Sequence, residues 1–309
     1  MELINTPPHY ILITSMNFPT GGAGATYLNL FCRGLILNRY SIRVLLLKGH
    51  AFGDYIYKGP RNNITVEGVP YTYLGFKQRP VNKFLKICEE SVSLCRLIVF
   101  LFSLAGESKS IRILVYNSDL LYNIPIHTFS KVFRIKIIKF VAEYIDKSEF
   151  GNSFFGRIKK YGYFLNFKYL NKISWKLIVF SNYLRDLYIR MGYNECNIIV
   201  QPNLTDFDNW GSETPEVKYT LGYSGAPYLK DGLYDMFRAI SLLRRENINL
   251  TLLVIGDAVF GESLIPGLKT ECTKLGISDC VVFTALVESP IVKKYLSECK
   301  ILTITRPST

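Results

Sequence analysis

The sequence predicts an α/β protein built from two doubly wound domains. Short apolar runs bounded by turn residues alternate with stretches of helix length, a pattern typical of a parallel sheet covered by helices on both faces. The alternation breaks near residue 203 and then starts afresh. A length of 309 residues suits roughly two domains of about 150 residues each. We therefore expect an N-terminal domain over residues 1–204 and a C-terminal domain over residues 205–309.

The first domain is expected to alternate strands with helices from residue 10 onward. The expected strands are residues 10–14, 43–47, 64–69, 71–74, 111–116, 135–141, 177–181 and 197–201. The expected helices are residues 25–38, 82–104, 124–133 and 182–191. The length of each run separates the two kinds of element, because apolar runs of four to eight residues favour strands and longer ones favour helices.

The second domain begins after a polar break at residues 202–206. Its expected strands are residues 219–224, 250–255, 281–284 and 301–305, and its expected helices are residues 232–245, 263–275 and 289–299. The chain stops four residues after the last of these strands, with no closing helix. Because doubly wound domains commonly run to about 100–200 residues, we expect this domain to be incomplete.

Composition removes several classes of protein. Hydrophobic residues make up 49% and charged residues 20% of the chain, which excludes a disordered or collagen-like polymer. The longest apolar run, residues 97–105, is too short to cross a bilayer, which takes about 20 residues. It predicts either a buried helix or one that touches a membrane surface. With no signal peptide visible, we expect a cytoplasmic protein.

The net charge of +12 is concentrated in the first domain. Residues 131–190 hold 13 basic and 4 acidic side chains, and aromatic residues are interleaved with them. Three interpretations compete: a solvated face whose aromatic rings turn inward, docking on an anionic membrane surface, or nucleic-acid binding by phosphate contacts and base stacking. No nucleic-acid module signature accompanies the charge, so a nucleic-acid partner is not expected.

A glycine-rich turn, with Gly21, Gly22 and Gly24, follows the first expected strand. Open parallel sheets bind ligands at the carboxyl ends of their strands, and glycines let backbone N–H groups approach a phosphate at a helix N-terminus. The turn is not the dinucleotide-binding motif G-x-G-x-x-G, because Tyr27 stands at the position of the third glycine. It is not a P-loop either, because no Gly-Lys-Ser/Thr follows. The turn therefore indicates either a phosphate contact or only a tight strand-to-helix connection.

The second domain opens in a similar way, with Gly225 and Lys230 between its first strand and first helix. A lysine beside a helix N-terminus suits a diphosphate, since its charge adds to that of the backbone donors. The alternative is an exposed loop lysine. Metal chemistry is not expected, because the three histidines lie far apart and the seven cysteines form no Cys-x-x-Cys pair.

Six segments, taken together and in order, resemble GT-B glycosyltransferases, which have two Rossmann-like domains. They are FPTGGAG (18–24), VQPNLTD (200–206), GAPYLKDG (225–232), LVIGD (253–257), LGISDCVVFTALV (275–287) and YLSECKILTITRPS (295–308). More narrowly they resemble the retaining sugar transferases of family 4. The resemblance implies a nucleotide-sugar donor in the second domain and an acceptor in the first, with no metal and no cofactor.

The resemblance also implies roles for individual residues. Lys230 would stabilise the leaving diphosphate, and the other donor-binding residues would be Gly21, Gly22, Gly24, Gly225, Phe283 and Val287. Asn117 and Glu143 lie at the strand ends where an acceptor is expected. Ala285 stands where the family usually has a glycine.

The implied activity is sugar transfer to a glycan or lipid-linked acceptor in cell-surface polysaccharide or glycolipid assembly, at the inner face of the membrane. The family's Glu-x7-Glu motif would lie beyond Thr309, so we expect a chain truncated at its C-terminus. Two alternatives follow. The first is that the chain is an inactive remnant or a binding module. The second, with less support, is a nucleotide-binding oxidoreductase, although the sequence lacks a proper dinucleotide-binding motif.

Overall fold

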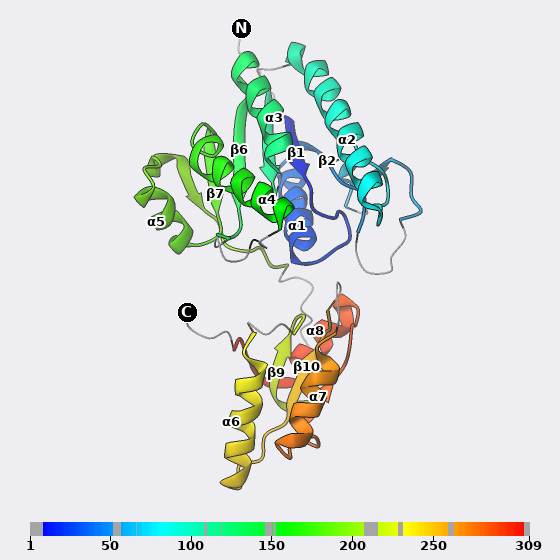
Figure 1. Cartoon of the computed structure of the whole chain (residues 1–309), viewed down its shortest axis with the longest axis vertical. Helices are drawn as coiled ribbons and strands as arrows, with labels where there is room; N and C mark the ends of the chain where they lie inside the picture. Colours follow the sequence, from blue (N-terminus) through cyan, green and yellow to red (C-terminus); the bar gives the residue numbers. More distant parts are fainter. Residues whose placement is uncertain are drawn as a thin grey trace. The chain divides into compact units, whose positions relative to one another are not determined.

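The computed structural model describes residues 9–51, 57–65, 67–107, 110–117, 119–145, 150, 153–206, 216–227, 231–258 and 263–305. The chain divides into two compact units, Met1–Thr205 and Asp206–Thr309. Each unit contains one sheet with helices packed on both of its faces (Figure 1). The predicted fold class, α/β with two doubly wound parallel sheets, is confirmed.

The described residues of unit 1 form an eight-stranded sheet with the order β3-β4-β2-β1-β5-β6-β7-β8. All neighbours pair in parallel except β3, which runs antiparallel to β4 at the edge. The strands are β1 (His9–Thr14), β2 (Ser41–Leu46), β3 (Asn62–Ile64), β4 (Pro70–Tyr73), β5 (Ile111–Tyr116), β6 (Lys136–Val141), β7 (Lys176–Val179) and β8 (Ile198–Val200).

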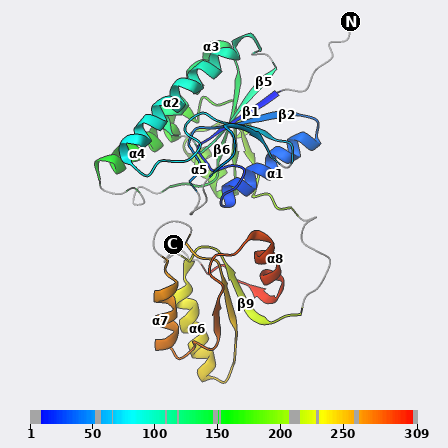
Figure 2. The ribbon, with the colours of Figure 1, turned by 90° about the vertical axis from the view of Figure 1, so that its right-hand side faces the viewer.

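The helices of unit 1 form two layers. The helix α1 (Ala23–Leu37) covers one face, where Tyr27 and Leu28 join a core with Leu12 and Val44 of the sheet. On the other face lie α2 (Lys83–Ser103), α3 (Leu120–Phe133) and α4 (Phe154–Leu165), followed by η3 (Asn166–Leu170); Figure 2 shows the two layers edge-on. A further helix, α5 (Asn182–Arg190), connects β7 to β8.

Unit 2 is a four-stranded parallel sheet with the order β11-β10-β9-β12. The strands are β9 (Tyr219–Ser224), β10 (Leu252–Ile255), β11 (Val281–Phe283) and β12 (Cys299–Leu302). The helices α6 (Leu233–Arg245) and α7 (Ile265–Lys274) lie on one face and α8 (Ser289–Ser297) on the other (Figure 2). Leu252 and Val254 pack against Phe237 and Leu268 in a separate core.

The structure departs from the expected elements in two regions. The strand expected at residues 64–69 is wrong: β3 ends at Ile64, and Gly68 lies in a turn with φ of 82°, where its amide donates to the carbonyl of Thr65 at 3.0 Å.

The other region lies between β6 and β7. The sequence predicts no helix between residues 141 and 176, yet α4 and η3 lie there. The Ser153 side chain caps α4 by accepting a hydrogen bond from the Gly156 amide. Gly162 lies so close to α3 that a Cβ atom added to it would be 3.5 Å from the Cβ atom of Leu120. The cap and this close approach fix a helix that contains two glycines and many aromatic residues, which are weak helix formers.

The aromatic residues of this region do not simply turn inward. Phe167 is buried, but Phe154, Tyr161 and Tyr169 are exposed. The interpretation of a solvated face with inward-turned rings is therefore wrong for these three residues.

A lysine lies buried in the core of unit 1. Lys139 of β6 is 6% exposed, and its Nζ atom has no hydrogen-bond partner among the described residues. In the same described part of the chain, the Nε2 atom of His127 on α3 is also buried without a hydrogen-bond partner. Burial lowers the pKa of Lys139 to about 7, while burial and then the charge of Lys139 lower the pKa of His127 to about 3. Burying these two basic groups without hydrogen-bond partners lowers the free energy of unfolding.

We expect Lys139→Met to raise the free energy of unfolding at neutral pH by about 3 kcal/mol, because the unfolded amine keeps a proton that the folded one loses. In the unsubstituted protein the unfolded state binds more protons above pH about 7, so stability rises with pH up to the ordinary lysine pKa. The variant loses that slope. Chemical denaturation across this pH range measures both effects, with exposed Lys131→Met as the control. Equal or lower stability of Lys139→Met contradicts the account.

Candidate functional site

Each sheet has a switch point, where the connections on its two sides leave toward opposite faces. In unit 1 it lies between β1 and β5, and in unit 2 between β9 and β12. Ligands of doubly wound sheets bind in the crevice at the carboxyl ends of these strands. Each unit therefore has its own candidate site, the surface at the carboxyl ends of the strands beside its switch point.

The strand-end surface of unit 1 brings several predicted residues together. Gly24 lies at the start of α1, where an added Cβ would clash with the methyl group of Met16 and would lie 3.7 Å from the hydroxyl of Tyr116. The Asn117 amide donates to the sulfur of Met16 at 2.8 Å. Burial, and then the charge of Glu143, raise the pKa of Tyr116. Gly24 and Asn117 thus both lie beside Met16, and the charge of Glu143 acts on Tyr116.

The other two glycines of this turn have different surroundings. The Cβ position of Gly21 lies 3.0 Å from Cβ of Asn17, which leaves little room for a side chain. Gly22 is the N-cap of α1 and makes no side-chain capping bond, and its Cβ position has no atom within 4 Å. The α1 N-terminus therefore presents backbone at an open position, which suits an anionic group.

An ion-pair network supports this surface. Lys48, beyond the end of β2, pairs with Asp119 at 2.5 Å and with Glu90 at 3.9 Å. Arg79 pairs with Glu89 and Glu90 at 3.0 and 3.1 Å. Glu89 is fully buried and accepts the Gly49 amide at 2.6 Å; burial raises its pKa despite that bond and Arg79.

The network fixes the segment that carries Asn117. Asp119 is the N-cap of α3 but makes no capping bond, because its carboxylate pairs with Lys48 instead. Asn117 itself has a left-handed φ of 46°. Sequence analysis missed Lys48, Arg79 and Met16, since their partners are 10 to 101 residues away along the chain.

In unit 2, two backbone segments meet at the switch point. Gly232, the N-cap of α6, has φ of 68°, and an added Cβ would overlap the carbonyl oxygen of Thr305. The Thr305 hydroxyl donates to the carbonyl of Asp231. The Thr303 amide and hydroxyl both donate to the carbonyl of Gly222, at 2.8 and 3.0 Å. The segment after β12 is thereby held against the start of α6.

A second close backbone approach joins the ends of β9 and β10. Gly225 has φ of 148°, and its carbonyl oxygen lies 2.7 Å from the Cβ position of Gly256, whose φ is 110°. The Gly256 amide donates to the carbonyl of Ala285 at 3.1 Å. Ala285 has a left-handed φ of 58°, which explains on physical grounds why a glycine suits this position.

The remaining predicted donor residues have mixed positions. Phe283 ends β11, two strands from the switch point, and its ring packs edge-on against Phe237 with 6.3 Å between centroids. Val287 is half-buried. Lys230 lies outside the described residues. At the start of the same loop, the Tyr223 hydroxyl donates to the buried carboxylate of Asp231 at 3.1 Å.

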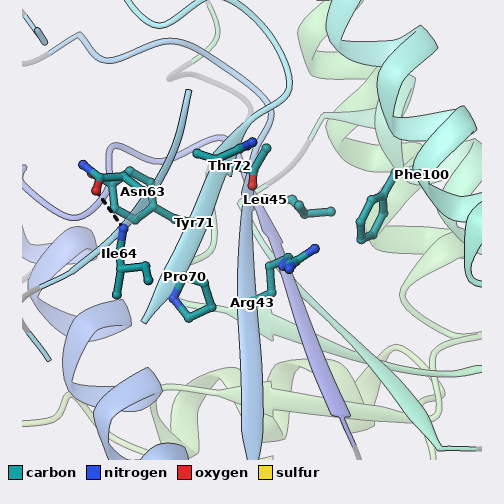
Figure 3. A pocket seen from close by; sticks show the side chains of 9 residues that line it. Arg43, Leu45, Asn63, Ile64, Pro70, Tyr71, Thr72 and Phe100 are labelled. Atoms are coloured by element: carbon teal, nitrogen blue, oxygen red, sulfur yellow. Dashed lines mark hydrogen bonds between the residues drawn. The ribbon is translucent and has the colours of Figure 1, made fainter. Parts of the chain in front are cut away.

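A separate recess lies on the sheet of unit 1. It encloses about 430 Å³ between β2, β4, β3 and α2. Figure 3 shows Phe100 on one side and Ile64 and Pro70 on the other, with Arg43 between them. None of the predicted site residues lines it.

Comparisons with known proteins identify the fold. Sucrose-phosphate synthase (tll1590) from Thermosynechococcus elongatus superposes with a TM-score of 0.67 and 13% identity, over 96% of this chain and 75% of that one. Alr3699/HepE of Anabaena in complex with UDP gives 0.63 and 13%, over 97% and 74%. The lipopolysaccharide outer core galactosyltransferase WaaB gives 0.58 and 13%, over 96% and 74%. No protein-family model and no curated protein matches the sequence. The chain has the GT-B fold of these glycosyltransferases.

We expect Gly232→Ala to lower the free energy of unfolding of unit 2 by about 3 kcal/mol or more, because a methyl group would force Thr305 away from the start of α6. Gly276→Ala is the matched control, since Gly276 also has φ of 68° but open space at its Cβ position. The control should lower the free energy of unfolding by only about 1 kcal/mol, because an alanine in the left-handed backbone region is strained even where space is open. Chemical denaturation measures the difference, and equal losses would show that the contact is unimportant.

The reverse change is expected to stabilise the protein at Ala285. Ala285→Gly relieves the left-handed strain of a residue with φ of 58° and should raise the midpoint of thermal unfolding, with a gain of about 0.5 to 1 kcal/mol. Ala258→Gly is the control on the same edge. A lower melting temperature for Ala285→Gly would mean that its backbone carries no strain.

Proposed function

We propose that the protein is a nucleotide-sugar-dependent glycosyltransferase. The observation that supports this most directly is the shared fold: proteins with the same two-unit architecture have been solved in complexes with UDP and UDP-glucose. The strand-end surfaces are where such a fold leaves backbone groups open to a ligand. Within the GT-B class, the sequence segments that resemble family 4 favour a retaining transferase.

The proposed donor site is the strand-end surface of unit 2. Gly225, Gly232 and Gly256 bring backbone close together there, and α6 begins without a side-chain cap, so its first N–H groups face an anionic ligand favourably. In the sequence, Lys230 belongs to the connection between β9 and α6. Its ammonium would stabilise the negative charge that develops on the departing nucleoside diphosphate. Phe283 and Val287 would frame the base through the backbone that follows β11.

The proposed acceptor site is the strand-end surface of unit 1. Asn117, just after β5, would offer an amide and Glu143, just after β6, a carboxylate, and both groups suit sugar hydroxyls. Gly21, Gly22 and Gly24, around the start of α1, are proposed to bind phosphate through the backbone. Lys48 and Asp119 act as positioning residues, because they hold the segment of Asn117 without reaching the ligand themselves. We expect neither metal nor cofactor in this reaction.

The proposed setting is the assembly of a cell-surface glycan or glycolipid. The basic excess of residues 131–190 supports peripheral attachment to an anionic membrane at its cytoplasmic face. Among the residues that the structure describes, no helix is long and apolar enough to cross a bilayer.

Lys230→Ala is expected to weaken UDP binding at least about tenfold, since a charge-assisted contact to a phosphate contributes about 1.5 to 3 kcal/mol. Isothermal titration of UDP into the 309-residue protein measures this. Lys300→Ala is the control, because Lys300 is exposed on β12 at the other end of the strands. Unchanged affinity for Lys230→Ala, with UDP still bound, would remove the lysine from the donor site.

A further inference from the structure

The outer strands of the unit 1 sheet leave one face open beside α2. Alternation along each strand and the pairing register place six side chains on this face: Arg43 and Leu45 of β2, Pro70 and Thr72 of β4, and Asn62 and Ile64 of β3. Leu45 is buried and packs with Leu97 of α2, whereas the other five are half-buried or exposed. The recess of about 430 Å³ forms here, where α2 no longer covers the sheet.

The opposite face of the same strands is fully packed. Val44, Tyr71 and Tyr73 are at most 4% exposed and belong to the core under α1. On the open face, by contrast, Ile64 is 63% exposed and the ring of Phe100 forms one side of the recess (Figure 3). A concave surface of this volume, mostly apolar with a few polar groups, has the character of a small-molecule site.

Arg43 gives the recess its charge. Among the described residues that line the recess, it alone is charged, and its guanidinium has no ion pair or hydrogen bond within the described part of the chain. Its side chain lies between Phe100 and Pro70 (Figure 3). A guanidinium among apolar groups is well suited to a planar anion that accepts two of its N–H groups at once.

Two neutral polar groups share the face with this cation. Asn62 and Thr72 lie directly opposite each other in the β3–β4 pair, and neither side chain has a hydrogen-bond partner among the residues that the structure describes. An amide and a hydroxyl can each donate to an oxygen. One cation with two neutral donors matches a carboxylate, which has one charge and two oxygens, whereas a diphosphate needs more positive charge than a single guanidinium supplies.

We propose that this recess binds a small organic carboxylate with an apolar body. The carboxylate pairs with the guanidinium of Arg43 and accepts a hydrogen bond from the amide of Asn62. The apolar body lies against Phe100, Ile64 and Pro70, and its burial adds to the affinity. The site is independent of the proposed sugar transfer, because none of the residues assigned to the donor or the acceptor lines the recess.

Titration of 3-phenylpropionate into the isotopically labelled 309-residue protein tests the proposal. We expect saturable shifts of the amide resonances of Leu45, Asn62 and Thr72. The alcohol 3-phenylpropan-1-ol has the same apolar body without the charge, and it should bind at least about tenfold more weakly, because it lacks the charge-assisted pair. The ester 2-phenylethyl phosphate, whose head group carries more charge, should also bind more weakly than the carboxylate.

Two variants remove the proposed contact in different ways. Arg43→Met keeps a long side chain but loses the charge, and it should weaken binding of 3-phenylpropionate at least about tenfold. Asn62→Asp hardly changes the shape of the side chain, yet its carboxylate would pair with Arg43 and repel the ligand, so the same loss is expected. The matched controls are Arg190→Met and Asn182→Asp, both exposed on α5, which should leave the affinity unchanged.

Several outcomes overturn the proposal: no saturable binding of 3-phenylpropionate at millimolar concentration, equal binding of the alcohol, tighter binding of the phosphate ester, or equal losses in recess and control variants. UDP titration on the same preparations separates the two hypotheses. UDP binding without 3-phenylpropionate binding removes the carboxylate site and leaves the proposed function, and the opposite result removes the proposed function and leaves the carboxylate site.

Discussion

The site depends on one geometric constraint, which is that parallel strands end at the same edge of their sheet. Where the connections change face, the crevice above two neighbouring strands stays uncovered, and the backbone there must find partners without a helix above it. In unit 2 the hydroxyls of Thr303 and Thr305 supply those partners by bonding to the carbonyls of Gly222 and Asp231. In unit 1 the ion pair of Lys48 with Asp119 fixes the connection after β5.

Glycine makes this arrangement possible at two places. The Thr305 carbonyl lies close to Gly232, and the Gly225 carbonyl lies close to Gly256. A methyl group on either glycine would overlap that carbonyl oxygen. The backbone N–H groups of the following helix are thereby left open at the strand ends, where an anionic ligand meets both their partial charges and the helix dipole. Packing elsewhere in the unit, such as that of Phe237 and Leu268, holds the strands in register and gives the edge its shape.

Much of the fold follows from the sequence because apolar periodicity reports burial directly. The runs at residues 111–116 and 219–224 match β5 and β9 to the residue. The helix α4 escaped prediction because its glycines, aromatic residues and lysines show no clear period, and its position depends on Ser153 and on contact with α3. Lys139 illustrates the same limit: a charged residue in a basic segment suggests the surface, and only the sheet shows that it faces the core. The turns in the sequence pointed to Gly24 and Gly225. Gly232 and Gly256 were not predicted as site residues, because the carbonyl groups they admit, like the partners of Met16 and Lys48, meet them only through the tertiary fold.

The central claim is that the strand-end surface of unit 2 binds the nucleoside diphosphate of a sugar donor. The most direct measurement is a titration of UDP into isotopically labelled protein, followed by the amide resonances. The account predicts that shifts concentrate at Gly225, Gly232, Gly256 and Ala285, with none at Asn62, Asn63 and Thr72 in the recess of unit 1. Binding that moves the recess resonances and leaves the glycines of unit 2 unchanged would contradict it.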